Sequence, residues 1–341
     1  LALIDMVDEQ LLVATDDDGV WKLPNGEAFY EHLLRRETTT ELTAAEIHQI
    51  GLDEVDRIHG EMRAVFEQLG YPAEAELDEL IPRAIEEAGR VPGGSDGAVA
   101  EYEALLAELD ERLYDVIDVR PQMGLVVEAQ PGLGGYYTPG NVDGSRPGVF
   151  HAGVGDSGLS RFEMATVAYH EAVPGHHLQD ALAKEMDLPT FRKLIFFNGY
   201  GEGWALYSER LAWELDLFAD DPYGNLGRLY MELLRSVRMV ADTGIHDQGW
   251  TREEARAYMT EVMGGDRWSG EVDRYIVWPA QSTEYKTGMM EILALRQRAM
   301  EALGEDYDPK AFHRAVLLNG GLPLTVLETV VDDYIETAQG Q

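Results

Sequence analysis

The segment from Tyr169 to Gln179 constrains this chain more than any other, because it joins a cluster of metal-ligand residues to a helix breaker. Between His170 and His177 it contains three of the nine histidines and one glutamate. Pro174 lies among them, and a proline inside a helix removes a backbone hydrogen bond and clashes with the preceding turn. The chain has no cysteine, so any metal must be held by imidazole and carboxylate groups. The segment therefore predicts a divalent metal site on an interrupted helix.

The spacing of the histidines decides which of them can bind one metal ion. In a His-Glu-x-x-His helix the two histidines share a face because they are four residues apart. Here the fourth residue after His170 is Pro174, so the second ligand must come later. We expect a bulge at Pro174-Gly175 that turns His176 back to the face of His170. His177 is the alternative ligand, and it would share that face only in a regular helix.

The residues before this segment predict how it is positioned. The sequence from Ser160 fits a capping box, so a helix should begin there and carry His170. Two short strands, at 123–129 and 148–152, precede the helix and are separated by a glycine-rich loop over 132–147. A strand beside a metal site can bind an extended peptide through main-chain hydrogen bonds. A hairpin that only covers the core fits the pattern equally well.

A second helix with carboxylates follows from about residue 199. Glu202 lies in its predicted first turn, among Gly199, Gly201 and Gly203. These glycines lack the preceding strand and the following acidic residue of a nucleotide-binding loop, so we expect them to allow close contact between helices. Glu202 is the predicted third ligand. Glu209, two turns later on the same face, either orients a ligand histidine or forms a surface salt bridge.

The remaining sequence is mostly helical. Capping boxes begin helices at Thr43 and Thr251, and Asp308-Pro309 begins another. These patterns, with the two strands, predict a mainly α fold with a small β-sheet, that is, an α+β protein. We expect residues 1–120 to form a helical N-terminal scaffold and residues 121–341 a catalytic region, in one compact unit.

The charge balance excludes some partners. The formal net charge is −36, and only five of the 27 basic residues are lysines. Proteins that bind nucleic acid need a basic surface that neutralises phosphates, so no nucleic-acid partner is expected. No apolar run is long enough to cross a membrane. The chain starts at Leu1 without an initiator methionine or a secretion signal, from which we expect a processed form or a fragment of a longer protein, with its compartment undetermined.

Four motifs in one order carry a family resemblance. They are His170-Glu171-Ala172-Val173-Pro174-Gly175-His176-His177-Leu178-Gln179, Gly201-Glu202-Gly203-Trp204-Ala205-Leu206-Tyr207-Ser208-Glu209, Asp242-Thr243-Gly244-Ile245-His246 and Arg274-Tyr275-Ile276-Val277-Trp278-Pro279-Ala280-Gln281. With them the chain resembles the bacterial proteins grouped as domain-of-unknown-function (DUF) family 885. Members of that family look like zinc metallopeptidases of the gluzincin type. The resemblance therefore implies a zincin-like architecture, with an active-site helix packed beside a short sheet.

The resemblance also implies roles for individual residues. His170, His176 and Glu202 would bind one zinc ion, which leaves a fourth position for water. Glu171 would act as the general base and pass the proton of that water to the leaving amine. The chain departs from the family pattern at Ala280, where glycine is frequent, and at Ser282-Thr283-Glu284.

Peptide hydrolysis further requires a donor for the oxyanion of the tetrahedral intermediate. His246, at the end of a predicted helix, is the first candidate and Tyr285 is the second. Arg274 and Lys286 could receive a substrate carboxylate. In so acidic a chain, either could instead pair with an acidic residue.

The main hypothesis from the sequence is a zinc-dependent hydrolase that cleaves peptide bonds in a peptide or small amide substrate. One alternative is a non-catalytic metal- or peptide-binding module derived from a peptidase. The intact Glu171 argues against it, because binding alone does not need a general base. Another alternative is hydrolysis of a different amide or an ester, which uses the same residues. The sequence does not set the oligomeric state.

Overall fold

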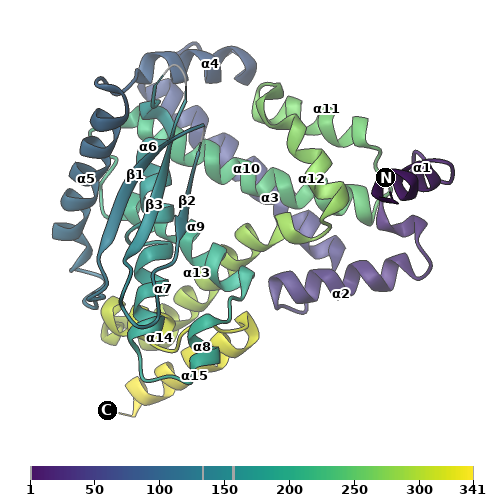
Figure 1. Cartoon of the computed structure of the whole chain (residues 1–341). Helices are drawn as coiled ribbons and strands as arrows, with labels where there is room; N and C mark the ends of the chain where they lie inside the picture. Colours follow the sequence, from purple (N-terminus) through teal and green to yellow (C-terminus); the bar gives the residue numbers. More distant parts are fainter. Residues whose placement is uncertain (1, 133, 156–157, 341) are drawn as a thin grey trace.

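The computed structural model describes residues 2–132, 134–155 and 158–340, and it consists mainly of helices with one three-stranded sheet (Figure 1). The predicted α+β class is confirmed. The α-helices are α1 Ala2–Leu11, α2 Gly26–Thr38, α3 Ala44–Gln68, α4 Leu77–Ala88, α5 Gly94–Leu113, α6 Arg161–Glu171, α7 His176–Glu185, α8 Thr190–Leu194, α9 Asn198–Glu214, α10 Pro222–His246, α11 Arg252–Met263, α12 Val272–Val277, α13 Glu284–Leu303, α14 Pro309–Leu317 and α15 Leu324–Gln339. Four short 3₁₀ helices are η1 Val20–Lys22, η2 Asp266–Glu271, η3 Gln281–Thr283 and η4 Gly304–Asp306.

The predicted helix starts are confirmed, but one of the predicted caps differs. Thr43 and Thr251 form complete capping boxes at the starts of α3 and α11. At α6 the side chain of Ser160 accepts a hydrogen bond from the backbone of Phe162, and no capping box forms. The carboxylate of Glu163 instead accepts hydrogen bonds from Arg267 of η2. The helix still begins where the sequence predicts, because the serine cap alone satisfies a free N–H group.

The sheet contains one strand more than the sequence predicts. Strands β1 (Leu125–Pro131) and β3 (Gly148–Val154) match the two predicted strands and pair in parallel. Strand β2 (Gly135–Thr138) lies within the predicted glycine-rich loop and pairs antiparallel with β3, in the order β1-β3-β2. Residue 133 of that loop lies outside the described residues. Strand β2 is therefore an edge of the sheet, and helix α5 packs on β1 and β3.

Two helix pairs hold the centre of the molecule together. Helix α3 runs along α10, where Val55 and Ile58 share a buried cluster with Leu229. Helix α9 packs on α13 at the point where Gly203 meets Gly288, and a Cβ on Gly203 would lie 2.5 Å from the backbone of Gly288. The prediction that glycines of α9 allow close helix packing is confirmed. The buried cluster of Val55, Ile58 and Leu229 thus contains residues from both sides of position 120. The division into a scaffold and a second region remains a prediction.

A buried charge network joins α3, α10 and α13. The Lys286 ammonium is fully buried, 2.6 Å from a carboxylate oxygen of Glu54 and 2.5 Å from one of Glu232. Arg57 pairs with both of these carboxylates, and Arg228 pairs with Glu232. The predicted role of Lys286 in binding a substrate carboxylate is corrected here, because its charge is already neutralised inside the core. The alternative of an acidic partner holds.

A second ionisable group of α13 is buried with no cationic partner among the described residues. Glu284, at the start of α13, is 1% exposed and accepts a hydrogen bond of 2.9 Å from Gln281. Burial, followed by the negative charges of Glu202 and Glu37, raises the pKa of Glu284 to about 9. The side chain is therefore neutral in the folded protein at pH 7.

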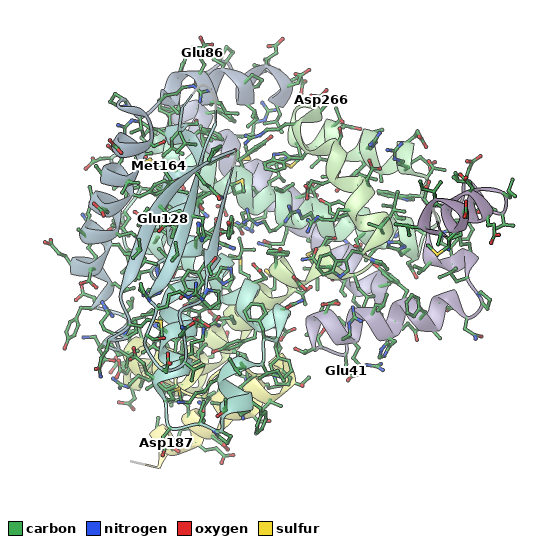
Figure 2. All side chains as sticks on the ribbon, in the orientation of Figure 1. Glu41, Glu86, Glu128, Met164, Asp187 and Asp266 are labelled. Atoms are coloured by element: carbon green, nitrogen blue, oxygen red, sulfur yellow. The ribbon has the colours of Figure 1, made fainter. Side chains whose placement is uncertain are left out.

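The surface is strongly acidic, in line with the net charge. Figure 2 shows acidic side chains spread around the fold, of which five labelled ones are exposed: Glu41, Glu86, Glu128, Asp187 and Asp266. Within the described ranges, no helix combines the length and the apolar character that crossing a membrane requires.

Replacing Lys286 by methionine is expected to lower the free energy of unfolding by roughly 3–5 kcal/mol, because two carboxylates stay buried with fewer cations. Urea denaturation followed by circular dichroism measures this. Lys22→Met, at an exposed lysine, is the control and should change stability by less than about 0.5 kcal/mol. Wild-type stability of Lys286→Met combined with lost activity would restore the substrate-binding role.

Glu284→Gln is expected to stabilise the metal-free protein at pH 8 but hardly at pH 5. Folded Glu284 keeps its proton up to about pH 9, whereas the unfolded chain releases it near its ordinary pKa of 4.5. The folded state thus binds more protons, so wild-type stability falls as pH rises between these values. The gain at pH 8 should be on the order of a few kcal/mol, measured by urea denaturation with a chelator. Equal effects at both pH values, or a similar gain in the exposed Glu301→Gln control, would contradict this cause.

Candidate metal centre

The metal-like segment folds as two helices rather than as one helix with a bulge. Helix α6 ends at Glu171, four non-helical residues follow, and α7 begins at His176. Gly175 makes this join possible, since a Cβ there would lie 1.9 Å from the carbonyl oxygen of His170. The backbone N–H of His177 then donates to the carbonyl of Ala172 at 3.0 Å. The predicted bulge is therefore a break between two helices, and this break also turns His176 toward His170.

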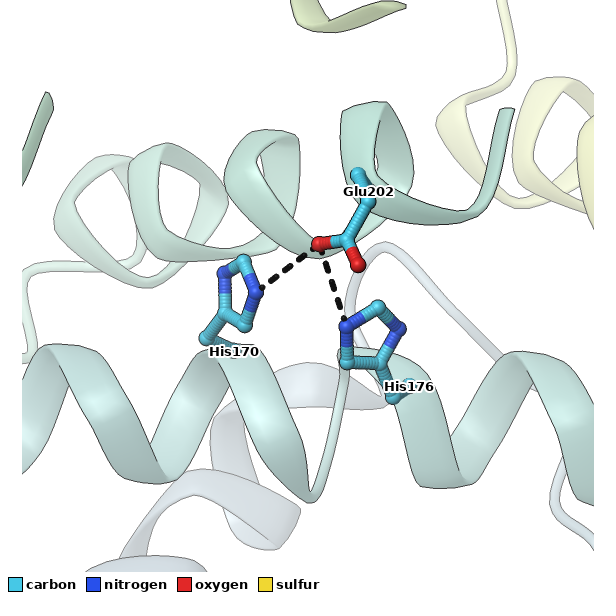
Figure 3. A group of neighbouring side chains, drawn as sticks. All are labelled: His170, His176 and Glu202. Carbon is cyan, nitrogen blue, oxygen red and sulfur yellow. Dashed lines mark ion pairs between the residues drawn. The ribbon is translucent and has the colours of Figure 1, made fainter. Parts of the chain in front are cut away.

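The join brings two histidines and one glutamate together. The Nε2 atoms of His170 and His176 each lie 3.4 Å from the same carboxylate oxygen of Glu202 (Figure 3). The potential ligand atoms of the three residues all lie within 4.8 Å of one another. They come from α6, α7 and α9. Two imidazole nitrogens and a carboxylate form a donor set that zinc accepts with one coordination position to spare.

The side chain of His177 lies on another side of α7. Its Nδ1 is 3.1 Å from the hydroxyl of Tyr137 on β2, and the two rings meet edge to face. Burial lowers the pKa of His177 to about 4, which keeps the ring neutral. The geometry thus groups His176, and not His177, with His170 and Glu202. A helix restarted at residue 176 explains why the neighbouring residue faces the sheet.

Glu209 supports His170 from within the core. One of its carboxylate oxygens accepts a hydrogen bond of 2.8 Å from Nδ1 of His170, and the other accepts one from the hydroxyl of Thr166. A guanidinium nitrogen of Arg235 lies 3.6 Å from Glu209. The carboxylate is 2% exposed, so the alternative of a surface salt bridge is wrong. A carboxylate in this position fixes which ring nitrogen of a histidine is free to bind a metal.

The charges of the group favour a bound cation. Burial opposes protonation of His170, but hydrogen bonds to Glu202 and Glu209 prevail and raise its pKa to about 9. Burial likewise opposes ionisation of Glu202, yet the two histidines hold its pKa well below the ordinary value. Positive charge between these side chains is therefore stabilised, whether a proton or a metal ion supplies it.

A cavity of about 500 Å³ opens over this group. It is lined by Gly135, Tyr136, Tyr137, Pro139, His170, Glu171, His176, Gln179, Asp180, Phe196, Glu202, Arg235, Arg238 and Tyr285. Edge strand β2 forms one wall. The predicted general base, Glu171, lies in the cavity beside its histidine neighbour, and burial raises the pKa of its carboxyl.

Tyr285 also reaches the cavity. Its hydroxyl accepts a hydrogen bond of 3.3 Å from Gln281, and burial raises its pKa to about 12. The hydroxyl therefore keeps its proton at neutral pH and can donate a hydrogen bond to a developing negative charge.

His246 does not belong to the cavity, which corrects its predicted role as oxyanion donor. It is the last residue of α10 and is 1% exposed. One ring nitrogen accepts a hydrogen bond from the backbone of Val20, and the other lies 3.0 Å from the carbonyl oxygen of Tyr275. With both nitrogens bonded to the backbone, the ring fastens η1 and α12 to α10.

Arg274 is likewise outside the cavity lining. Its guanidinium lies 2.9 Å from the carboxylate of Glu271 and donates to Gln281 at 2.7 Å. The alternative of an acidic partner therefore fits Arg274 better than the predicted contact with a substrate.

Two arginines of α10 occupy the cavity in place of the predicted cations. Arg235 and Arg238 line it, although neither stands in a recognisable motif. The signal in the sequence is their spacing of three residues within the apolar run Leu233–Val240. Arginines on the buried face of a helix need partners. Arg235 lies beside Glu209, and Arg238 contacts Tyr275 of α12 and Glu271 of η2.

Solved structures show the same fold in two other proteins. One is described as a putative lipoprotein from Colwellia psychrerythraea, with 38% identity and a TM-score of 0.91 over 98% of this chain. The other, from Shewanella oneidensis, is described as a putative lipoprotein of unknown function, with 22% identity and a TM-score of 0.81 over 96% of this chain. This chain spans 60% and 63% of those two chains.

Sequence comparison gives the family. Among proteins with curated descriptions, none matches this chain. The model of a family described as bacterial protein of unknown function (DUF885) matches residues 1–331. That match includes the two histidines, Glu202 and every residue that lines the cavity. The chain therefore belongs to the DUF885 family of bacterial proteins.

Proposed function

We propose that this chain is a zinc-dependent hydrolase that cleaves peptide bonds, with a zincin-like arrangement of α6, α7 and α9 beside the sheet. The observation that carries the proposal is the position of Glu171. It directly follows one member of the His170, His176 and Glu202 group, and it lies in the same cavity. A site that only bound metal would not need a carboxylate there.

A residue of this chain can be assigned to each step of hydrolysis. A zinc ion bound by the three side chains would polarise a water molecule and the substrate carbonyl. Glu171 takes the proton from the water and delivers it to the leaving nitrogen. Tyr285 donates a hydrogen bond to the oxyanion. Glu209 holds the ring of His170 in the orientation that binding requires.

Strand β2 favours a peptide over other amides or esters. It is an edge of the sheet, and Gly135, Tyr136 and Tyr137 line the cavity. An extended peptide can pair with the free edge of such a strand through main-chain hydrogen bonds, which do not depend on its sequence. An ester or a small amide would leave this edge unused.

Glu171→Gln is expected to keep zinc and lose peptidase activity. Glutamine has nearly the same shape but cannot accept the proton, so the rate should fall by about 10²–10⁴. Zinc content is measured by atomic absorption, and cleavage of a mixed peptide library by mass spectrometry. Glu128→Gln, on the exposed side of β1, is the control and should be fully active. Full activity of Glu171→Gln would refute the assignment of the base.

Exchanging the two adjacent histidines for alanine should separate their roles. His176→Ala is expected to weaken zinc binding by at least about a hundredfold, since even loss of a residue that only orients a ligand costs ten- to hundredfold. His177→Ala should bind zinc nearly as well as the wild type. Competition with a chromophoric chelator measures both affinities, and thermal unfolding checks that each variant is folded. The reverse order of affinities would make His177 the ligand.

A further inference from the structure

The cavity has a cationic wall on α10. Among its lining residues in the described parts of the chain, Arg235 and Arg238 are the only arginines, and no lysine is present. They sit three residues apart and so share one face of the helix. Permanent positive charge in a cavity of so acidic a protein calls for an anionic partner.

The anionic partner of Arg235 is Glu209. One of its nitrogens donates to the carbonyl of Met231 at 3.0 Å, and another lies 3.6 Å from the Glu209 carboxylate that supports His170. Arg235 therefore helps to hold Glu209, which in turn orients His170.

Arg238 is held differently and remains available. Its Nε lies 3.2 Å from the hydroxyl of Tyr275, and its Nη2 lies 3.1 Å from the carboxylate of Glu271. The guanidinium also lies over the ring of Tyr285, 5.4 Å from its centre. The group is thus fixed in orientation, while its Nη1 has no hydrogen-bond partner among the described residues.

The charge around Arg238 is not balanced. Glu271 is shared with Arg274, which lies 2.9 Å from it. Two guanidinium groups therefore face one carboxylate, which leaves a net charge of +1 beside the cavity. Nη2 has a second N–H group besides the one directed at Glu271. Together with Nη1, that group presents the planar fork to which a carboxylate can bind by two parallel hydrogen bonds.

We propose that Arg238 binds the carboxyl-terminal carboxylate of the substrate, so that the site cleaves peptides from their carboxyl end. The inference rests on the proposed hydrolase function and names its substrate class. The C–N bond breaks near the anchored terminus, the hydroxyl of water joins the carbonyl carbon, and the water proton passes through Glu171 to the new amine. The products are a shortened peptide and a released carboxyl-terminal fragment.

The test compares two peptides that are identical except for a free carboxylate or an amide at the carboxyl terminus. Their binding is measured by calorimetry on zinc-loaded Glu171→Gln protein, in which cleavage does not interfere. We expect the free acid to bind roughly ten- to hundredfold more tightly. Adding Arg238→Gln should reduce this preference to less than about threefold by weakening the acid only. Arg238→Lys, which keeps the charge but not the planar fork, should be intermediate.

Controls separate this inference from the proposed function. Arg252→Gln removes a partly exposed arginine that pairs with Asp273, away from the cavity lining, and should leave the preference unchanged. Thermal unfolding checks each variant, and if Arg238→Gln is unfolded, Arg238→Lys decides. Equal affinity for acid and amide in the starting protein, or a preference that survives loss of Arg238, would overturn the inference.

The second measurement is cleavage of the same two peptides by the zinc-loaded wild-type protein. Cleavage of the acid alone, with release of one or a few residues from its carboxyl end in mass spectra, supports the inference. Equal cleavage of acid and amide at internal bonds refutes it while leaving a peptidase. No cleavage of either peptide refutes the hydrolase, and the binding comparison then still decides whether Arg238 recognises a carboxylate.

Discussion

The metal group depends on the close passage of Gly175 over the carbonyl oxygen of His170. At that point a Cβ would come within 1.9 Å of the oxygen, so any side chain would push α7 away from α6. With glycine there, α7 restarts so that the ring of His176 meets that of His170 at a centroid distance of 4.9 Å. The proline before it ends one helix, and the glycine allows the next to begin almost at once. Pro174 and Gly175, which carry no reactive groups, thus determine how the two histidines are placed relative to each other.

Helix α10 then links this group to the rest of the molecule. It lies along α3 and carries Glu232 of the buried charge network, Arg235 beside the support of His170, and Arg238 in the cavity. Its last residue, His246, holds η1 and α12 through the backbone. Glu232 pairs with Lys286 of α13, and Arg235 lies beside Glu209 of α9. Through these charged contacts α10 fixes the positions of its neighbours more narrowly than apolar contacts alone would.

The sequence predicts the elements that local rules govern. Capping residues place the starts of α3, α11 and α14, and the pattern of His170, Glu171 and Pro174 indicates a metal group on a broken helix. Glu202 and Glu209 follow from helical periodicity. The sequence does not reveal β2, because four residues in a glycine-rich loop become a strand only through pairing with β3.

The roles of the cations also escape prediction, for a physical reason. For Lys286 and Arg274 the sequence leaves both a substrate carboxylate and an acidic partner open. The structure decides for acidic partners, which come from distant helices for Lys286 and from a carboxylate shared with Arg238 for Arg274. Arg238 looks like an ordinary helix residue in the sequence, and only the folded structure shows that it lines the cavity. Whether a charge is free or paired is decided by tertiary contacts that no local pattern contains.

The meeting of Gly203 and Gly288 has a consequence for how the centre could evolve. Glu202 precedes the glycine whose backbone touches α13, so the depth at which α9 packs also sets how far the carboxylate reaches toward the histidines. A methyl group on either glycine would lift α9 outward and retract the ligand without changing any ligand. The reach of Glu202 toward the histidines therefore depends on two positions that carry no side chain. Relatives with alanine at one of these positions would need a compensating shift of the whole helix to keep the same arrangement of the three side chains.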